Sequence, residues 1–289
     1  MKPEPRTLDF GKTVSVSNIM TNFHDFYFII VTYHPEINLL KETLSLLNNW
    51  PVVIVDNNHL PKKSLLLHRA KRRNIKIISS GKNLGYAGGA NIGIKKALSS
   101  RAKWIVILNP DIKINRKCLG LFLKKIRKGN CDMSGPFLGA LDDKRWSTIY
   151  PIVKTSTRLQ TCYLSGAFIC YSKEVFEKVG LFNENYFLYY EDVDFFIRAV
   201  KKGFLYHHIK LDNIIDYDSS ILEKDSFLHQ YYLARNHLLF VEKNAPMSVK
   251  IFELIRLPKT IWQYLTLKDT GALLGIRDYF LRRFGKIEA

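Results

Sequence analysis

Four short apolar runs, separated by segments with helical periodicity, constrain the fold of this chain more than any other feature. The runs are rich in Val, Ile and aromatic residues and occupy 26–33, 51–58, 75–80 and 103–111. The intervening segments, which begin at Ile37, Lys62 and Gly88, carry apolar residues at helical spacing and basic residues on the outer face. This order predicts an α/β fold with a mostly parallel central sheet, covered by helices on both sides.

Polar residues follow each of the four runs. Ligands of open α/β sheets bind in the crevice beyond the carboxyl ends of the strands, so these ends predict one binding crevice. Asp, Asn, Gly and Pro are also ordinary turn residues, and a single one of these ends is more readily explained as a turn. The four together favour a site. They are 31–36, Asp56-Asn57-Asn58, Gly81-Lys82-Asn83 and Asn109-Pro110-Asp111.

The charge of the chain indicates an anionic partner. It carries 44 Lys and Arg against 26 Asp and Glu, a formal net charge of +18 over 289 residues. Nucleotide phosphates, nucleic acid or an anionic membrane face would each match this excess. The four cysteines show no C-x-x-C pair and no metal-ligand spacing with histidine, which argues against zinc and predicts a reduced, cytoplasmic setting. No apolar run reaches the length of a signal peptide or a membrane span, so we expect a chain that is neither exported nor membrane-spanning.

Two further segments carry candidate chemistry. The segment 81–97 contains glycine at 85, 88, 89 and 93, but its spacing matches neither the nucleoside-triphosphate loop nor the dinucleotide fingerprint. The run "YYEDVDFF" (189–196) places Glu191, Asp192 and Asp194 among aromatic and aliphatic residues. Carboxylates in such surroundings need a partner, a metal ion or a proton. An acidic helix N-terminus, favoured by the helix dipole, is the alternative without catalysis.

The segments "NLGYAGGANIGI" (83–94), "VILNPD" (106–111) and "LSGAFICYSKEVFEKVGLFNENYFLYYEDVDFFIRAVKKG" (164–203) resemble successive signatures of family 2 glycosyltransferases, particularly their bacterial rhamnosyltransferase-like branch. The resemblance extends from about Phe28 to Asn244. It implies a GT-A fold, in which a Rossmann-like, mostly parallel sheet is flanked by helices, and inverting transfer of a sugar from a nucleotide donor.

The resemblance also implies a domain organisation. Residues 1–24 would be a polar lead-in and 25–245 the GT-A domain, divided into a nucleotide-sugar-binding half (25–112) and an acceptor-binding and catalytic half (113–245). Residues 246–289 would form a helical extension with basic, amphipathic helices, although an ordinary solvated helix face explains their pattern equally well.

For the donor, the resemblance implies that Asp56 reads the uracil or thymine base. Lys82 is a possible phosphate contact, but a lysine beside a turn is more often simply solvated. Arg235 would face the diphosphate or the acceptor, and its alternative is an ion pair with the acidic run. The remaining donor-binding candidates are Thr32, Tyr33, Asn83, Gly85 and Asn109.

For the metal ion, Asp111 occupies the family's ligand position, and the resemblance implies Mg²⁺ or Mn²⁺. Asn109 replaces the first acid of the usual D-x-D motif, which leaves one carboxylate. A histidine found in many relatives is missing here, so Asp216 or Asp218 is the candidate substitute. The pair His207-His208 comes too early in the chain and is more typical of a strand edge.

For catalysis, the resemblance makes Asp192 the general base that deprotonates the acceptor hydroxyl. Glu191 and Asp194 would orient this base, bind acceptor hydroxyls or pair with Arg198, which lies at i+4 from Asp194. Gly166 and Tyr190 would contact the acceptor.

These features together predict a metal-dependent, inverting hexosyltransferase. The branch resemblance favours dTDP-rhamnose as donor, with a UDP-hexose next, and a lipid-linked or cell-surface oligosaccharide as acceptor. An acceptor of this kind and the basic C-terminal residues predict peripheral association with the inner face of an anionic cell membrane. A nucleic-acid-binding module is an alternative for which we find no motif, so we expect no nucleic acid as partner, and a hydrolase using the same carboxylates is another. The sequence predicts no oligomeric state.

Overall fold

The computed structural model describes residues 23–58, 73–149, 161–212, 214–216 and 226–287. The polar lead-in, apart from its last two residues, and the helix expected to begin at Lys62 lie outside the described residues, as does Asp218.

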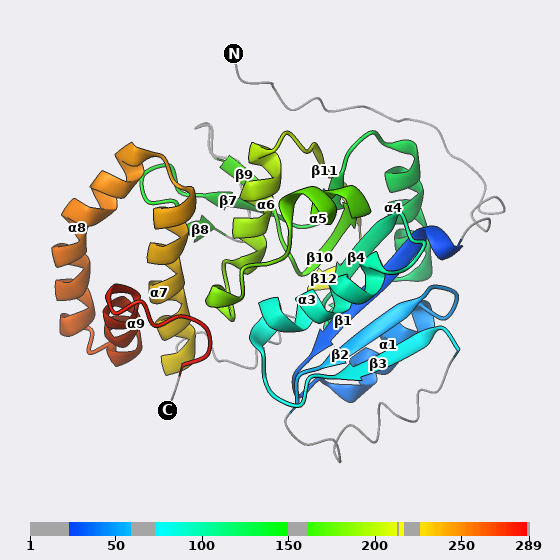
Figure 1. The fold of residues 1–289 in the computed structure, drawn as a ribbon, viewed down its shortest axis with the longest axis horizontal. Coiled ribbons are helices and arrows are strands. Elements are labelled where there is room, and N and C mark those ends of the chain that lie inside the picture. Colours follow the sequence, from blue (N-terminus) through cyan, green and yellow to red (C-terminus); the bar gives the residue numbers. More distant parts are fainter. Residues whose placement is uncertain (1–22, 59–72, 150–160, 213, 217–225, 288–289) are drawn as a thin grey trace.

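A seven-stranded sheet forms the centre of the molecule, and its strand order is β11-β6-β10-β4-β1-β2-β3 (Figure 1). β1 pairs in parallel with β2 and β4, and β2 pairs in parallel with β3, as the sequence predicts. β10 is antiparallel to both of its neighbours, which makes the whole sheet mixed. The strands are β1 (Phe26–Thr32), β2 (Val52–Asp56), β3 (Ile75–Ser79), β4 (Trp104–Leu108), β6 (Met133–Gly135), β10 (Phe168–Ser172) and β11 (Tyr206–His208). His207 and His208 therefore lie on an edge strand, as expected.

Both faces of this sheet are covered, which explains why its central strands are continuous apolar runs. Every residue of β1 and β2 is buried. Successive residues of β1 enter opposite layers of the core, since Ile29 belongs to one apolar cluster and Phe28 to the other. The first cluster includes residues of α3 (Gly85–Leu98), α5 (Lys173–Val179) and α6 (Glu191–Lys201). The second includes residues of α1 (Ile37–Leu46) and α4 (Arg116–Lys128).

Two helices of the second layer begin at side-chain caps. The carboxylate of Glu36 accepts hydrogen bonds from the backbone N–H groups of Asn38 and Leu39, and Asn115 accepts one from Cys118. Such caps satisfy donors that the first turn of a helix leaves unpaired. They fix where the chain turns after β1 and before α4, and Glu36 itself lines the cavity described below.

Two smaller sheets and two short turns complete the described fold before the C-terminal helices. One sheet consists of β7 (Leu138–Leu141), β8 (Thr148–Ile149) and β9 (Thr161–Leu164), and the other of β5 (Ile112–Lys113) and β12 (Ile215–Asp216). In the second sheet the main chain of Asp216 pairs with Ile112, next to Asp111. The 3-10 turns are η2 (Phe23–Asp25) and η3 (Glu184–Tyr186).

Three helices follow at the C-terminal end and lie together at the left of Figure 1. They are α7 (Phe227–Asn244), α8 (Met247–Thr266) and α9 (Thr270–Phe280). α7 packs against α9 over most of its length, and α8 contacts both. The predicted helical extension is therefore present. Among the described residues, none of the helices combines the length and the apolar character that crossing a bilayer would require.

Candidate active site

A cavity of about 650 Å³ opens where the strand ends meet. Tyr33 follows β1, Asn57 follows β2, Asn83 precedes α3 and Asn109 follows β4, and all four line this cavity. The predicted convergence of the strand ends on one crevice is thus confirmed. The opposite wall comes from the turn at Ser165–Ala167, from residues 187–193 and from α7.

The donor-binding candidates divide into two groups. Tyr33, Asn83, Gly85, Asn109 and Asp111 line the cavity. Thr32, Asp56 and Lys82 are not among the lining residues, and their side chains have other surroundings. The Thr32 hydroxyl donates to the carbonyl of Val55 at 3.5 Å, and one oxygen of Asp56 accepts from the backbone and side-chain amides of Asn58 at 3.0 and 2.6 Å. The Lys82 side chain is exposed.

Asn57, which the sequence did not single out from its strand end, joins the two sides of the donor region. Its side-chain amide donates to the carbonyl of Gly85 at 2.7 Å and so fixes the start of α3 against β2. Gly85 has a φ of 72°, and an added Cβ would lie 2.2 Å from the carbonyl oxygen of Phe187. A side chain at this position is therefore excluded by both conformation and space.

Asn109 and Asp111 place side-chain oxygen atoms that could bind a metal ion close together in the cavity wall. The backbone N–H of Asn109 donates to Ala167 at 2.8 Å, whereas its buried side-chain oxygen has no hydrogen-bond partner among the described residues. Asp111 follows two residues later, and β12 brings the main chain of Asp216 beside it. Amide and carboxylate oxygens of this kind suit a hard divalent cation. Among the described side chains, however, no group of three His, Cys, Asp or Glu residues could by itself hold a metal ion.

The loop before the acidic run, residues 185–190, has an unusual backbone. Phe187, Tyr189 and Tyr190 have φ values of 61°, 65° and 71°, in the left-handed region that side chains other than glycine rarely adopt. Such conformations cost free energy and persist where the surroundings impose them. Tyr190 is the last residue before α6, so the loop fixes the position of Glu191 and Asp192, the first two residues of this helix.

Arg235 and Asn236 of α7 hold this loop in place. The Asn236 amide lies 2.8, 2.7 and 3.0 Å from the carbonyls of Tyr186, Leu188 and Tyr189. The guanidinium of Arg235, which is 1% exposed, donates to the carbonyls of Asn185, Tyr186 and Gly285.

The expectations for Arg235 therefore need correction. Its N–H groups donate to three backbone carbonyls and to the side chains of Asn236 and Tyr231. It neither lines the cavity nor pairs with a carboxylate of the acidic run. Arg235 and Asn236 thus form a clamp on the loop 185–190. The sequence contained a hint of it, since this polar pair stands at the centre of an otherwise largely apolar helix. What it does not reveal is that Asn236 makes more contacts with the loop than Arg235.

Asp194 lies behind the cavity wall and is 1% exposed. Its carboxylate accepts hydrogen bonds from Arg198 at 2.8 Å, from Tyr186 at 3.1 Å and from Asn244 at 2.8 Å. Of the three roles that the sequence left open for Asp194, the structure confirms the ion pair with Arg198 at i+4. Asp194 thus ties α6 to η3 and α7 and does not reach the cavity.

Asp192 lines the cavity at the first turn of α6 and is fixed by the backbone. One carboxylate oxygen accepts from the N–H of Gly166 at 2.7 Å and the other from Val193 at 2.8 Å. Burial raises the pKa of Asp192, and these backbone hydrogen bonds oppose the rise. The arrangement holds a carboxylate in a defined direction with lone pairs left for a substrate.

Glu191 lines the same cavity and differs from Asp192 in its partners. It is 5% exposed, and one of its oxygens has no hydrogen-bond partner among the described residues. Burial, and then the charge of Asp192, raise the pKa of Glu191 well above its ordinary value. Burial thus raises the pKa of both adjacent carboxyl groups, and in Asp192 backbone hydrogen bonds from Gly166 and Val193 oppose the rise.

Tyr86 and Tyr190, which also line the cavity, link its walls to neighbouring elements. The Tyr86 hydroxyl donates to the carbonyl of Gly166 at 3.1 Å, which links the start of α3 to the turn that holds Asp192. The Tyr190 hydroxyl lies 3.3 Å from Nδ1 of His237, whose Nε2 lies 3.4 Å from Glu253 of α8. Although burial acts in the opposite direction, His237 and Arg145 lower the pKa of Glu253 to about 2.

The central sheet with its helices and the cavity lined by the N-P-D turn and the acidic run define a GT-A glycosyltransferase. A comparison with family models gives a match to glycosyl transferase family 2 over residues 27–180. The chain belongs to this family.

Similarity to individual proteins indicates the branch of the family to which the chain belongs. The chain is 31% identical to the dTDP-rhamnosyl transferase RfbF of Shigella flexneri, over 79% of this chain and 84% of that protein. It is 26% identical to the low-salt glycan biosynthesis hexosyltransferase Agl10 of Haloferax volcanii, over 67% of each. It is 24% identical to the N-acetylglucosaminyl-diphospho-decaprenol L-rhamnosyltransferase of Mycobacterium tuberculosis, over 72% of this chain and 80% of that protein. The rhamnosyltransferase-like branch is thus confirmed.

A solved structure supports the fold. Residues 1–349 of S. aureus TarS in complex with UDP-GlcNAc superpose with a TM-score of 0.50 at 15% identity, covering 88% of this chain and 80% of that one.

Proposed function

We propose that this protein is an inverting glycosyltransferase that moves a sugar from a nucleoside-diphosphate donor to a hydroxyl of a lipid-linked oligosaccharide. dTDP-rhamnose is the first candidate donor, because one relative is a dTDP-rhamnosyl transferase and another is an N-acetylglucosaminyl-diphospho-decaprenol L-rhamnosyltransferase. A UDP-hexose is the second. The observation that carries the proposal is a single cavity lined by Asn109 and Asp111 on one side and by Glu191 and Asp192 on the other.

Asp192 is the proposed general base. An acceptor hydroxyl bound beside it transfers its proton to the carboxylate while its oxygen bonds to the anomeric carbon. The bond from this carbon to the diphosphate oxygen breaks at the same time, and the electron pair leaves with the diphosphate. The N–H groups of Gly166 and Val193 favour the ionised carboxylate, which the buried position disfavours. The backbone thus orients the base and opposes the rise in its pKa that burial causes.

Asn109 and Asp111, with Asp216 as a third candidate, would hold Mg²⁺ or Mn²⁺. When bound, such an ion neutralises the charge of the departing diphosphate. The buried, unpartnered oxygen of Asn109 supports this role, because a buried acceptor without a partner costs free energy until a ligand occupies it. The shortage of carboxylates among the described residues suggests that the donor completes the coordination.

Glu191 is the proposed contact for the acceptor. Its raised pKa favours a protonated carboxyl group, which donates a hydrogen bond as well as accepting one. Placed beside an ionised Asp192, it would orient the attacking hydroxyl without competing for its proton. We further propose that the enzyme works at the inner face of the cell membrane, where a lipid-linked acceptor is located.

A transfer assay tests the proposal. The purified protein is incubated with dTDP-rhamnose or a UDP-hexose, Mg²⁺ or Mn²⁺ and a polyprenyl-diphosphate-linked saccharide, and both nucleotide release and the extended saccharide are measured. We expect acceptor-dependent release and an extended product of inverted anomeric configuration. Nucleotide release with free sugar, equal with and without acceptor, would favour the hydrolase instead.

A further inference from the structure

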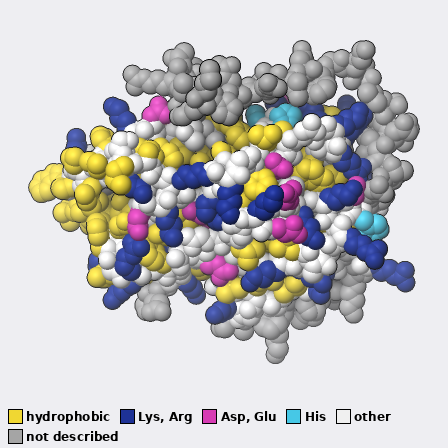
Figure 2. Space-filling view, turned by 45° about the horizontal axis from the view of Figure 1, so that its top comes forward, with side chains coloured by type: hydrophobic (Ala, Val, Ile, Leu, Met, Phe, Trp, Pro, Cys, Tyr) yellow, Lys and Arg dark blue, Asp and Glu magenta, His cyan; other side chains and the backbone are white. Residues whose placement is uncertain are grey.

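Helix α8 exposes an apolar stripe that the fold does not use. The stripe consists of Met247, Ile251, Leu254, Ile255, Trp262 and Leu265, whose side chains are between 50% and 75% exposed. Figure 2 shows hydrophobic side chains gathered at the end of the molecule formed by α8 and α9. Proteins that stay monomeric in water rarely expose contiguous apolar patches of this kind unless a partner covers them.

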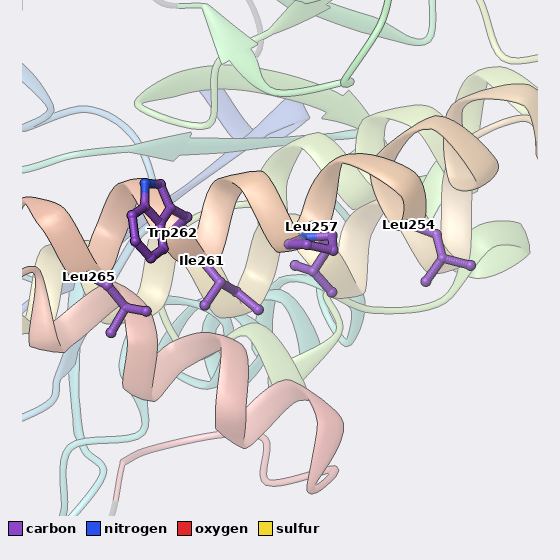
Figure 3. A pocket seen from close by; sticks show the side chains of 6 residues that line it. Leu254, Leu257, Ile261, Trp262 and Leu265 are labelled. Carbon is purple, nitrogen blue, oxygen red and sulfur yellow. The ribbon is translucent and has the colours of Figure 1, made fainter.

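The spacing of these residues places them on one side of the helix. Steps of three, four and seven residues give a stripe about 100° wide. In Figure 3, Leu254, Trp262 and Leu265 project from α8, and together with Leu257, Pro258 and Ile261 they line an open apolar groove.

The rest of α8 is already anchored to the protein. Leu257 and Ile261 pack on Ala272 and Ile276 of α9, and Glu253 is buried beside Arg145 and His237. The position of α8 therefore does not depend on the stripe. We therefore expect substitutions in the stripe to leave the fold intact, and the stripe can be tested by mutation.

The charged side chains of α8 that are not buried are all basic. The ionised side chains of α8 that reach solvent are Lys250, Arg256 and Lys259, and Lys268 follows its last turn. The acidic residue of α8, Glu253, is 5% exposed and paired. On a helical projection Lys259 lies at one margin of the stripe and Lys250 at the other. An apolar strip with lysines at both margins is the pattern of a helix that lies in the plane of a bilayer surface, with the lysine stems directed to the head groups.

From this arrangement we infer that α8 is the docking surface of the protein for an anionic membrane, with the stripe inserted among the acyl chains and the lysines among the head groups. A second copy of the chain fits less well. Self-pairing of the stripe would bring the lysine margins of two copies together, and like charges oppose such a pairing. A tryptophan at this depth also matches a bilayer surface, where its apolar ring and its N–H are both accommodated.

The docked geometry suits the proposed acceptor, and this step alone depends on the proposed function. Leu228 and Tyr232 of α7 line the cavity, and α8 packs against the same helix. A bilayer in contact with α8 would thus lie one helix layer away from the site, close enough for an acceptor that remains anchored in the membrane.

Vesicle binding without any nucleotide sugar tests the inference. The full chain is sedimented with vesicles of phosphatidylcholine and phosphatidylglycerol, and with vesicles of phosphatidylcholine alone. A stripe variant carries Ile255→Gln, Trp262→Gln and Leu265→Gln, and a control variant carries Leu121→Gln, Ile149→Gln and Leu205→Gln at exposed apolar positions elsewhere. We expect the stripe variant to partition about tenfold more weakly or worse and the control variant to match the wild type.

Tryptophan fluorescence supplies a local readout. Trp262 is the most exposed of the four tryptophans, so its emission should shift to shorter wavelength on anionic vesicles, and the shift should vanish in Trp262→Phe. Equal losses in the stripe and control variants, or no binding to anionic vesicles at low salt, would overturn the inference. So would a dimer in sedimentation velocity that the stripe variant abolishes, because a second copy would then be the occupant. A failure of the proposed function can be told apart from a failure of this inference by a transfer assay with a water-soluble acceptor. If the proposed function is wrong, the wild-type protein shows no transfer in that assay, whatever its binding to vesicles.

Discussion

The carboxylate of Asp192 accepts a hydrogen bond from the backbone N–H of Gly166 at 2.7 Å. The two residues come from different walls of the site, since Gly166 lies between β9 and β10 and Asp192 begins α6. A Cβ added to Gly166 would lie 2.7 Å from the Cβ of Asp192. The proposed base is therefore placed by a contact that tolerates no side chain.

We expect Gly166→Ala to displace the Asp192 carboxylate and to reduce transfer strongly while the protein remains folded. Relief of such a contact by local movement costs about 1 to 3 kcal/mol of unfolding free energy. The comparison is with Ala167→Ser, which enlarges the neighbouring residue by a hydroxyl group without entering this contact. Transfer rates and thermal unfolding are measured for both. Wild-type turnover in Gly166→Ala would show that the position of the carboxylate is not critical.

Asp192→Asn should lower transfer by about a hundredfold or more, because an amide has no basic lone pair for the acceptor proton. The donor should bind almost as in the wild type. The amide can accept from Gly166 or from Val193 but not from both in the same way, so we also expect a loss of about 1 to 3 kcal/mol in stability. Single-turnover rates and donor titration separate these effects. Retention of most of the turnover contradicts the assignment of the base.

The raised pKa of Glu191 predicts a pH-dependent stability difference for Glu191→Gln. A carboxyl group whose pKa is higher in the folded than in the unfolded state holds its proton more tightly when folded. Its contribution to stability is therefore present at acidic pH and is lost as the pH rises above about 4.5, the ordinary value. Glu191→Gln lacks this loss, so its melting temperature should match the wild type at pH 4 and exceed it increasingly towards pH 8. A difference that is constant with pH would show that Glu191 is not the group responsible.

Asp111→Ala should weaken donor binding in the presence of Mg²⁺ or Mn²⁺ and have little effect in its absence. The reason is that this carboxylate is the proposed protein charge on the cation. Asp143→Ala, at an exposed aspartate outside the cavity, is the matched control. Calorimetric titration of the donor with metal and with a chelator gives the result. Unchanged metal-dependent affinity in Asp111→Ala would exclude it as a ligand.

Asn236→Ala should destabilise the protein by about 2 to 4 kcal/mol, because the carbonyls of Leu188 and Tyr189 lose this donor, whereas that of Tyr186 keeps its hydrogen bond from Arg235. It should also reduce transfer although Asn236 does not line the cavity, since the left-handed residues of the loop would relax. Lys243→Ala, on an exposed position of the same helix, controls for α7 itself. Denaturant unfolding and transfer rates are measured together. Loss of stability with unchanged turnover would leave the clamp a purely structural role.

The sequence by itself determined the layers of the fold and the location of the cavity. The apolar runs at β1, β2 and β4 are local patterns, because a strand that is buried on both faces is apolar at most positions. The crevice followed from the same pattern, since parallel strands bring their carboxyl ends to one edge. The antiparallel β10 was not foreseen, because a pairing direction depends on distant chain segments.

The tertiary structure decided which polar residues face the cavity and which support it. Asp192 and Asp194 stand two residues apart in one acidic run, yet the first lines the cavity and the second is enclosed by Arg198, Tyr186 and Asn244. Arg235 likewise has partners that no local pattern reveals, such as the carbonyl of Tyr186, 49 residues earlier in the chain. Likewise the sequence showed that α8 is amphipathic, but its apolar stripe could equally have been buried. Hydrophobic periodicity shows which side of a helix is apolar, but only the packing of distant segments decides whether that side is buried.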